Sequence, residues 1–178
     1  EYSSVDLAGT SLDLSVQSLA RVLDGADVVI NLVGLAHDNS LKNIPSSYPL
    51  YHFANVQLAL LLAKASSCAG VLSFIQASSI AVNDLSLDTQ PINESSPILL
   101  TDSYSISKYI AETELSSCLY SSEISLLMLR LPLVYGATPK GNMASLANLL
   151  SLSPVNIFSL LQSKRSFLSV TNLSVCLD

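Results

Sequence analysis

The 178-residue chain is 49% hydrophobic and 12% charged, and its net charge is −6 at pH 7. This composition is typical of a globular domain with a sizeable core and excludes a disordered chain or a coiled coil. The acidic balance argues against a nucleic-acid partner, because surfaces that bind nucleic acids are basic.

The longest apolar stretch, residues 56–63, is far shorter than the roughly 20 residues that span a bilayer. The three cysteines are odd in number and lie far apart in apolar segments, which favours buried thiols over a disulfide framework or a zinc site. We therefore expect a cytoplasmic protein with no membrane partner and no metal.

The first half of the chain predicts two helix-to-strand units. A helix over residues 15–23 closes at Gly25 and is followed by an apolar strand over residues 28–33. A second helix over residues 49–67 precedes an apolar strand over residues 71–77.

A third unit follows a polar loop over residues 84–101. Asp102 or Ser103 can cap a helix that runs to about residue 117, and an apolar strand occupies residues 124–131. Continuous apolar strands separated by helices predict right-handed crossovers and a parallel sheet with helices on both faces. The predicted fold class is α/β and Rossmann-like.

Ligands of such sheets bind beyond the carboxyl ends of the strands. The three predicted strand ends are Gly34, Ser78-Ser79 and Leu131-Pro132. The helix with Tyr104 and Lys108 begins after a loop long enough to return it to this edge. These residues are therefore predicted to share one site.

Tyr104 and Lys108 are four residues apart, so on a helix they project from one face. A nearby ammonium favours the phenolate, and we expect it to lower the pKa of Tyr104 from about 10 toward the range of an efficient general base. The alternative interpretation is an ordinary helix pair with Tyr104 half-buried and Lys108 solvated.

Several motifs in order resemble the extended short-chain dehydrogenase/reductase family, specifically its nucleotide-sugar epimerases and dehydratases. Residues 28–34 (VVINLVG) resemble the strand under the dinucleotide, and Asn55-Val56 the asparagine helix. Residues 78–83 (SSIAVN) resemble the catalytic serine strand, and residues 129–136 (LRLPLVYG) the nicotinamide loop.

The resemblance implies roles for individual residues. It implies that Tyr104 is the acid/base, that Lys108 modifies its pKa and binds the nicotinamide ribose, and that Ser79 donates to the reacting hydroxyl. It also implies NAD as cofactor, with NADP left open, and a UDP-linked sugar as substrate. The implied cofactor contacts are Asp6, Leu7, Leu32, Val33, Gly34, Asn55, Ser78, Lys108, Leu131 and Pro132, and the implied substrate contacts are Ser79, Tyr104, Asn142 and Arg165.

Three of these residues have plain alternatives. Asp6 is equally read as a turn or cap residue, Asn55 as a satisfied polar group inside a helix, and Arg165 as a solvated charge.

The family's glycine-rich turn, which binds the pyrophosphate, is missing from this sequence. We therefore expect a chain truncated at both ends that binds NAD poorly as written. Residues 1–136 are predicted to form a partial dinucleotide-binding domain and residues 137–178 a partial substrate-binding region.

Two positions bear on the reaction type. Family dehydratases carry an Asp-Glu pair directly after the strand-end serine or threonine, where this chain has Ile80 and Ala81. Elimination is therefore disfavoured. The resemblance leaves epimerisation through a 4-keto sugar, with a 4-keto reductase or a non-catalytic interaction module as alternatives. Asn83, where many relatives have tyrosine, hints at the branch that acts on UDP-N-acetyl sugars. The family often pairs the helices equivalent to residues 49–67 and 102–117 across a dimer, which predicts a homodimer for the full-length protein.

Overall fold

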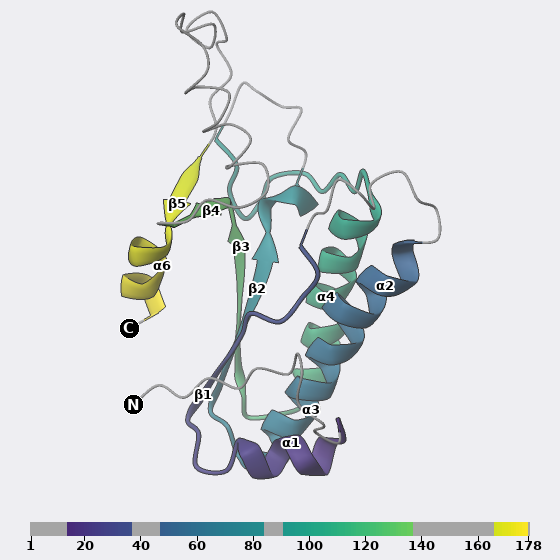
Figure 1. Cartoon of the computed structure of the whole chain (residues 1–178), viewed down its shortest axis with the longest axis vertical. Helices are drawn as coiled ribbons and strands as arrows, with labels where there is room; N and C mark the ends of the chain where they lie inside the picture. The colour runs from purple at the N-terminus through teal and green to yellow at the C-terminus, as the bar shows by residue number, and fades with distance from the viewer. Residues whose placement is uncertain (1–13, 37–46, 84–90, 137–165, 178) are drawn as a thin grey trace, which may run out of the picture.

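The structure is a computed structural model that describes residues 14–36, 47–83, 91–136 and 166–177. Its centre is a parallel sheet of three strands in the order β1-β2-β3 (Figure 1). The strands are β1 (Val28–Asn31), β2 (Ser73–Ser79) and β3 (Ser125–Leu131). The α/β class with a parallel sheet is confirmed.

The sheet register aligns the strand ends that the sequence singled out. β1 pairs with β2 from Val28 beside Ser73, and β2 pairs with β3 as far as Ser79 beside Leu131. Paired residues of parallel strands lie on the same face of the sheet, so each face can be followed across all three strands.

Strand β1 ends two residues earlier than predicted. The side-chain oxygen of Asn31 accepts from the backbone N–H of Val33 at 3.0 Å, which turns the chain out of the sheet. The side-chain nitrogen of the same Asn31 donates to Gln76 Oε1 on β2 at 2.8 Å. A buried asparagine thus ends the strand and ties it to its neighbour.

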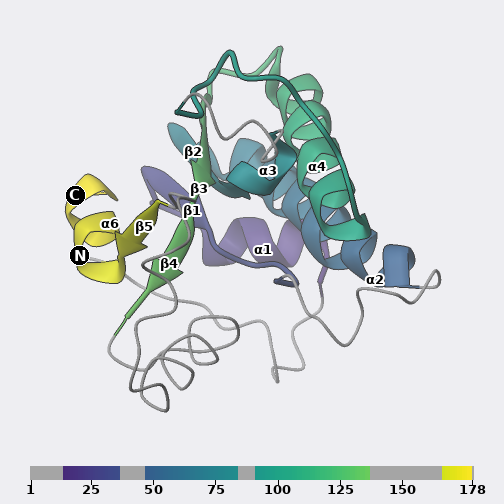
Figure 2. The same cartoon turned by 90° about the horizontal axis from the view of Figure 1, so that it is seen from above.

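Helices α1 (Val16–Val22), α3 (Leu58–Ala69) and α4 (Ser103–Leu119) lie together on one side of this sheet (Figure 2). Their apolar faces close over a buried cluster that includes Val29 and Phe74 of the sheet and Leu115 of α4. Burial of these side chains is the main stabilising term of the fold.

The predicted helix over residues 49–67 is present but is not uniform. It consists of α2 (Tyr48–His52), a π-helical turn η2 (Phe53–Gln57) and α3. Such turns widen a helix locally and often occur at functional sites. Gly70, at φ 75°, ends α3 as predicted, because a left-handed cap is cheapest for glycine.

Helix α4 begins with a capping box at Asp102. The Asp102 carboxylate accepts from Ser105 N at 2.8 Å, and the Ser105 hydroxyl accepts from Asp102 N at 3.1 Å. Two backbone donors of the first turn are thereby satisfied. Of the two predicted caps, Asp102 is therefore the cap.

A second, two-stranded parallel sheet lies on the other side of the main sheet with helix α6 (Figure 2). It pairs β4 (Leu133–Tyr135) with β5 (Phe167–Ser169), and α6 (Val170–Leu177) follows β5 directly. This sheet joins residues on both sides of the predicted domain boundary at 136, which stays a prediction.

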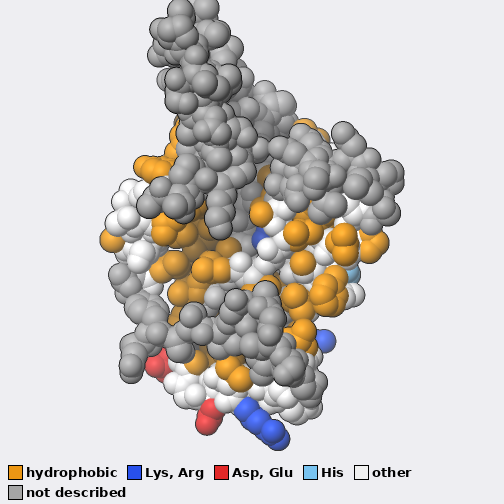
Figure 3. Space-filling view, in the orientation of Figure 1, with side chains coloured by type: hydrophobic (Ala, Val, Ile, Leu, Met, Phe, Trp, Pro, Cys, Tyr) orange, Lys and Arg blue, Asp and Glu red, His pale blue; other side chains and the backbone are white. Residues whose placement is uncertain are grey.

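The surface shows two further features. Hydrophobic side chains gather over the sheet in the view of Figure 3, and Val28, Leu32 and Leu127 are among the exposed apolar residues. Cys68 and Cys176 are exposed and Cys118 is half-buried, so the prediction of buried thiols is wrong. Among the described helices, none combines the length and apolar character that crossing a membrane requires.

Candidate active site

Helix α4 begins beside the carboxyl end of β2, and this brings three predicted residues together. Tyr104, in the first turn of α4, lies within hydrogen-bonding reach of Ser79, the last residue of β2. The ring of Tyr51 packs edge-on against Tyr104, with the ring centroids 6.1 Å apart. The phenol is thereby held against the strand end. The roles of these residues in a reaction stay predictions.

Lys108 lies one helical turn after Tyr104 and is buried, with 7% of its surface exposed. Its ammonium Nζ donates to the carbonyl oxygen of Ala77 at 3.1 Å and lies 5.9 Å from the centroid of the Tyr104 ring. The alternative of a solvated lysine is therefore wrong.

The electrostatics of the pair differ from the sequence expectation. Burial raises the pKa of Tyr104 above its ordinary value, with smaller contributions from Asp102 and Tyr51 in the same direction, and the Ser79 hydrogen bond opposes it. Burial also lowers the pKa of Lys108, against the effect of the Glu112 carboxylate. The expected lowering of the Tyr104 pKa by Lys108 is thus wrong for this structure. The physical reason is that removing a group from water disfavours its charged form.

Asn55 clamps the loop after β1 against α4. Its Oδ1 accepts from Leu35 N at 2.7 Å, and its Nδ2 donates to Leu35 O at 3.2 Å and to Ser107 Oγ at 2.9 Å. Ser107 in turn donates to the carbonyl oxygen of Tyr104 at 2.7 Å. Asn55 is therefore a fully buried amide whose hydrogen bonds are all made within the protein, and it holds one wall of the site.

Gly34 lies against this clamp. A Cβ atom at position 34 would come 2.6 Å from Asn55 Oδ1 and 3.3 Å from Lys108 Nζ. Only a glycine lets the backbone pass so close to both side chains. The three strand ends are therefore brought to one edge, beside Tyr104 and Lys108.

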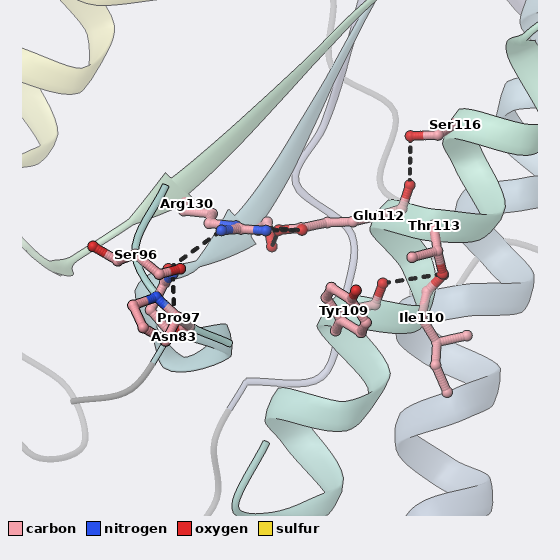
Figure 4. A network of polar contacts seen from close by, with 10 residues as sticks. Asn83, Ser96, Pro97, Tyr109, Ile110, Glu112, Thr113, Ser116 and Arg130 are labelled. Carbon is pink, nitrogen blue, oxygen red and sulfur yellow. Dashed lines mark hydrogen bonds and ion pairs between the residues drawn. The ribbon is translucent and has the colours of Figure 1, made fainter. Parts of the chain in front are cut away.

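A second polar network lies deeper along α4 (Figure 4). Glu112 Oε1 accepts from Ser78 Oγ at 2.5 Å, and Arg130 of β3 donates from Nε to Oε1 at 3.0 Å and from Nη2 to Oε2 at 2.6 Å. Asn83 joins this network, since its Oδ1 accepts from Arg130 Nη1 at 3.4 Å and its Nδ2 donates to Ser96 O at 3.0 Å.

Sequence reasoning missed Glu112 and Arg130. Two signals were present: Glu112 is four residues after Lys108, and Arg130 is the only charged residue of the predicted strand over residues 124–131. The network borders a pocket of about 500 Å³. Its lining residues are Ile80, Asn83, Ile92, Asn93, Glu94, Glu112, Met128, Leu129, Arg130 and Leu131.

Of the remaining predicted contacts, some lie near the strand ends, one is buried inside the protein, and others lie outside the described part of the chain. Leu32 is exposed over 66% of its surface, Gly34 is also exposed, and Val33, Leu131 and Pro132 are half-buried near the strand ends. Ser78 is buried and engaged with Glu112. Four predicted residues lie outside the described part of the chain: Asp6, Leu7, Asn142 and Arg165.

The parallel sheet, with Ser79, Tyr104 and Lys108 beside its carboxyl edge, has the place and form of a ligand site in an open α/β fold. Residues 3–177 match the family model described as NAD dependent epimerase/dehydratase family. The chain therefore belongs to the NAD-dependent epimerase/dehydratase family, whose related members are enzymes acting on nucleotide sugars.

A curated relative supports this assignment. The chain is 33% identical over 153 residues to a UDP-glucose 4-epimerase of Vibrio cholerae, a match that covers 85% of this chain and 46% of that enzyme. The chain thus spans about half the length of the curated relative.

Solved structures show the same fold. A UDP-N-acetylglucosamine 4-epimerase from Bacillus cereus aligns with a TM-score of 0.72 and 20% identity, over 93% of this chain and 56% of that one. The Bordetella bronchiseptica enzyme WbmG, solved with NAD and UDP, aligns with a TM-score of 0.66 and 23% identity, over 93% and 50% of the two chains. At these identities the likeness establishes the fold alone.

Proposed function

We propose that this protein is an NAD-dependent epimerase of a nucleotide sugar, either a UDP-hexose or a UDP-N-acetylhexosamine, that works through a 4-keto intermediate. The observation that carries the proposal is the placement of Tyr104 beside Ser79, with the buried Lys108 one turn further along α4. Family membership supports the same reaction class.

The chemistry follows from what these side chains can do. Oxidation of a sugar carbinol removes a proton from oxygen and a hydride from carbon. In the proposal Tyr104 accepts and later returns the proton, and Ser79 holds the hydroxyl in line with the phenol. NAD, when bound, would supply the hydride acceptor, and its positive charge would favour the phenolate that burial alone disfavours.

The residues at the strand ends suit a dinucleotide. The backbone at Gly34 packs directly against Asn55 and Lys108, because a Cβ there would come within 2.6 Å of Asn55 Oδ1 and 3.3 Å of Lys108 Nζ. An ammonium has three N–H donors, so the bond to Ala77 O leaves capacity for a ribose hydroxyl. We assign Gly34, Lys108, Leu131 and Pro132 to direct contact with NAD. Asn55 and Ser78, which are bonded within the protein, are assigned to supporting this wall.

Ile80 and Ala81 bear on the choice of reaction. They form a short 3-10 turn after β2, which Ser79 Oγ caps by accepting from Ala81 N at 3.2 Å. Neither side chain can protonate a leaving hydroxyl, which argues against a dehydratase. A 4-keto reductase would use the same three residues and remains the second candidate.

The deciding assay incubates the full-length gene product with NAD and UDP-glucose or UDP-N-acetylglucosamine and follows the C4 epimer by NMR. Epimerisation consumes no net cofactor, whereas a reductase consumes reduced cofactor in step with product. Tyr104→Phe should reduce kcat by at least about a hundredfold, the typical contribution of a general acid or base. Tyr120→Phe is the matched control, because Tyr120 is 88% exposed at the end of the same helix. Equal turnover by both variants would refute the mechanism, and no dinucleotide binding would favour a non-catalytic module.

A homodimer is proposed for the same protein. Leu50 and Phe53 project from α2 and η2 with more than half of their surfaces exposed, which suits an interface between helices. Light scattering of the full-length protein should give twice the monomer mass, and a monomer at micromolar concentration would contradict this expectation.

A further inference from the structure

Glu112 has no part in the proposed chemistry, yet three donor atoms of two side chains contact its carboxylate. Its side chain is only 7% exposed and accepts from Ser78 Oγ and from two nitrogens of Arg130. Burying a carboxylate is unfavourable unless it is paired and hydrogen-bonded. The chain therefore maintains a charged group at this position with a full set of partners.

The partners of Glu112 come from the strands that end at the site. Ser78 directly precedes Ser79 on β2, and Arg130 is the residue opposite Ser78 in the register of β2 and β3. Glu112 thereby joins α4 to the last residues of two strands. Figure 4 shows its side chain extending from the helix toward Arg130.

Three consecutive residues of β2 in fact hold three turns of α4. Ala77 O accepts from Lys108, Ser78 donates to Glu112, and Ser79 lies within hydrogen-bonding reach of Tyr104. Residues 104, 108 and 112 are spaced by four and so lie on one face of the helix. A shift of the Glu112 anchor would move the other two contacts along the same rigid element.

We propose that Glu112 is a positioning residue for the Tyr104–Lys108 pair: it fastens α4 to the ends of β2 and β3 and places a carboxylate one helical turn from the Lys108 amine.

The charged surroundings of Lys108 support this role. Burial lowers the pKa of Lys108, and Glu112 is the group that opposes the effect. On α4, Tyr104 is the other titratable neighbour, and on α2 Tyr51 faces the Tyr104 ring. Among the residues that the structure describes, the other groups close to the ammonium are uncharged: Ala77 O on β2 and the backbone at Gly34. Asp102 raises the pKa of Tyr104, and Arg130 is hydrogen-bonded to Glu112.

The test measures the titration of Lys108 directly, without turnover. Lysines labelled at the ε-carbon are followed by NMR from pH 7 to 12 in the chain itself, and the Lys108 signal is assigned by its loss in Lys108→Met. In Glu112→Gln the titration midpoint of Lys108 should fall by about one pKa unit, since a neutral amide no longer favours the ammonium. Glu112→Asp should restore part of the loss.

Glu114→Gln is the matched control, because Glu114 is exposed on the same helix two residues further along. Its Lys108 midpoint should stay within about 0.2 units of the wild type, as expected for a screened surface charge. If Glu112→Gln fails to fold, the pair Glu112→Gln and Arg130→Gln is measured in its place, and the same fall is expected. An unchanged midpoint in the folded variant, or equal shifts in Glu112→Gln and Glu114→Gln, overturns the proposal.

A second measurement rests on the proposed function and uses the full-length protein. Glu112→Gln should move the alkaline limb of the kcat profile to lower pH and leave KM for the nucleotide sugar within about twofold, whereas a merely destabilising change would not move the limb. If the protein turns over no sugar, the proposed function fails and the NMR titration still decides the role of Glu112.

Discussion

Replacement of Gly34 by alanine is the sharpest test of the wall that Asn55 forms. The added Cβ would approach Asn55 Oδ1 to 2.6 Å, a separation that requires one of the two groups to move. Movement breaks the bonds of Asn55 with Leu35 N and Leu35 O, each worth about 1 kcal/mol. A buried amide left partly unpaired costs about 1–3 kcal/mol. This cost already includes part of the energy of the two lost bonds, so the two figures are not simply added. We therefore expect the free energy of unfolding to fall by about 2–4 kcal/mol.

Chemical denaturation followed by circular dichroism measures this loss. The melting temperature should fall by about 5–15 °C, given about 2–4 °C per kcal/mol for a chain of this size. Gly136→Ala is the control, because its Cβ would meet Val170 at an ordinary 3.4 Å. Combining Gly34→Ala with Asn55→Ala should cost less than the sum of the two single changes, since each disrupts the same bonds. A loss below about 0.5 kcal/mol for Gly34→Ala would refute the reasoning, because surface changes alone produce that much.

Three further predictions concern Lys108, Tyr104 and Phe74. Because the folded pKa of Lys108 is lowered, its ammonium opposes folding at neutral pH, and Lys108→Met should raise the free energy of unfolding at pH 7. In denaturant titrations this advantage of the variant should shrink as the pH rises from the lowered pKa of the folded state toward the unfolded value of about 10.4. Because the folded pKa of Tyr104 is raised, absorbance at 295 nm should show one phenol ionising above pH 10 that Tyr104→Phe removes, and the wild type should lose stability above that pH relative to the variant. Phe74 is fully buried, so Phe74→Ala should cost about 3–5 kcal/mol in the same denaturation assay, and a loss under 1 kcal/mol would contradict its place in the core.

Local sequence patterns were enough for the three helix-to-strand units and their order. The apolar runs, Gly70 and Asp102 mark strands, a helix end and a helix start, because these depend on neighbours within a few residues. The parallel sheet followed from the alternation of helices and strands. The early end of β1 did not, since it depends on the Asn31 side chain, which accepts from Val33 N and donates to Gln76, 45 residues away.

The candidate site divides in the same way. The sequence by itself determined that Ser79, Tyr104 and Lys108 belong at the carboxyl edge of a parallel sheet, because helical spacing and strand ends are local properties. Only the tertiary structure decided that Lys108 is buried and that the pKa of Tyr104 is raised, because burial depends on how α4 packs against β2. The pairing of Glu112 with Arg130 likewise required the tertiary structure, because the register of β2 and β3 places Arg130 opposite Ser78. The positions of Glu112 and Arg130 in the sequence do not indicate that they are in contact.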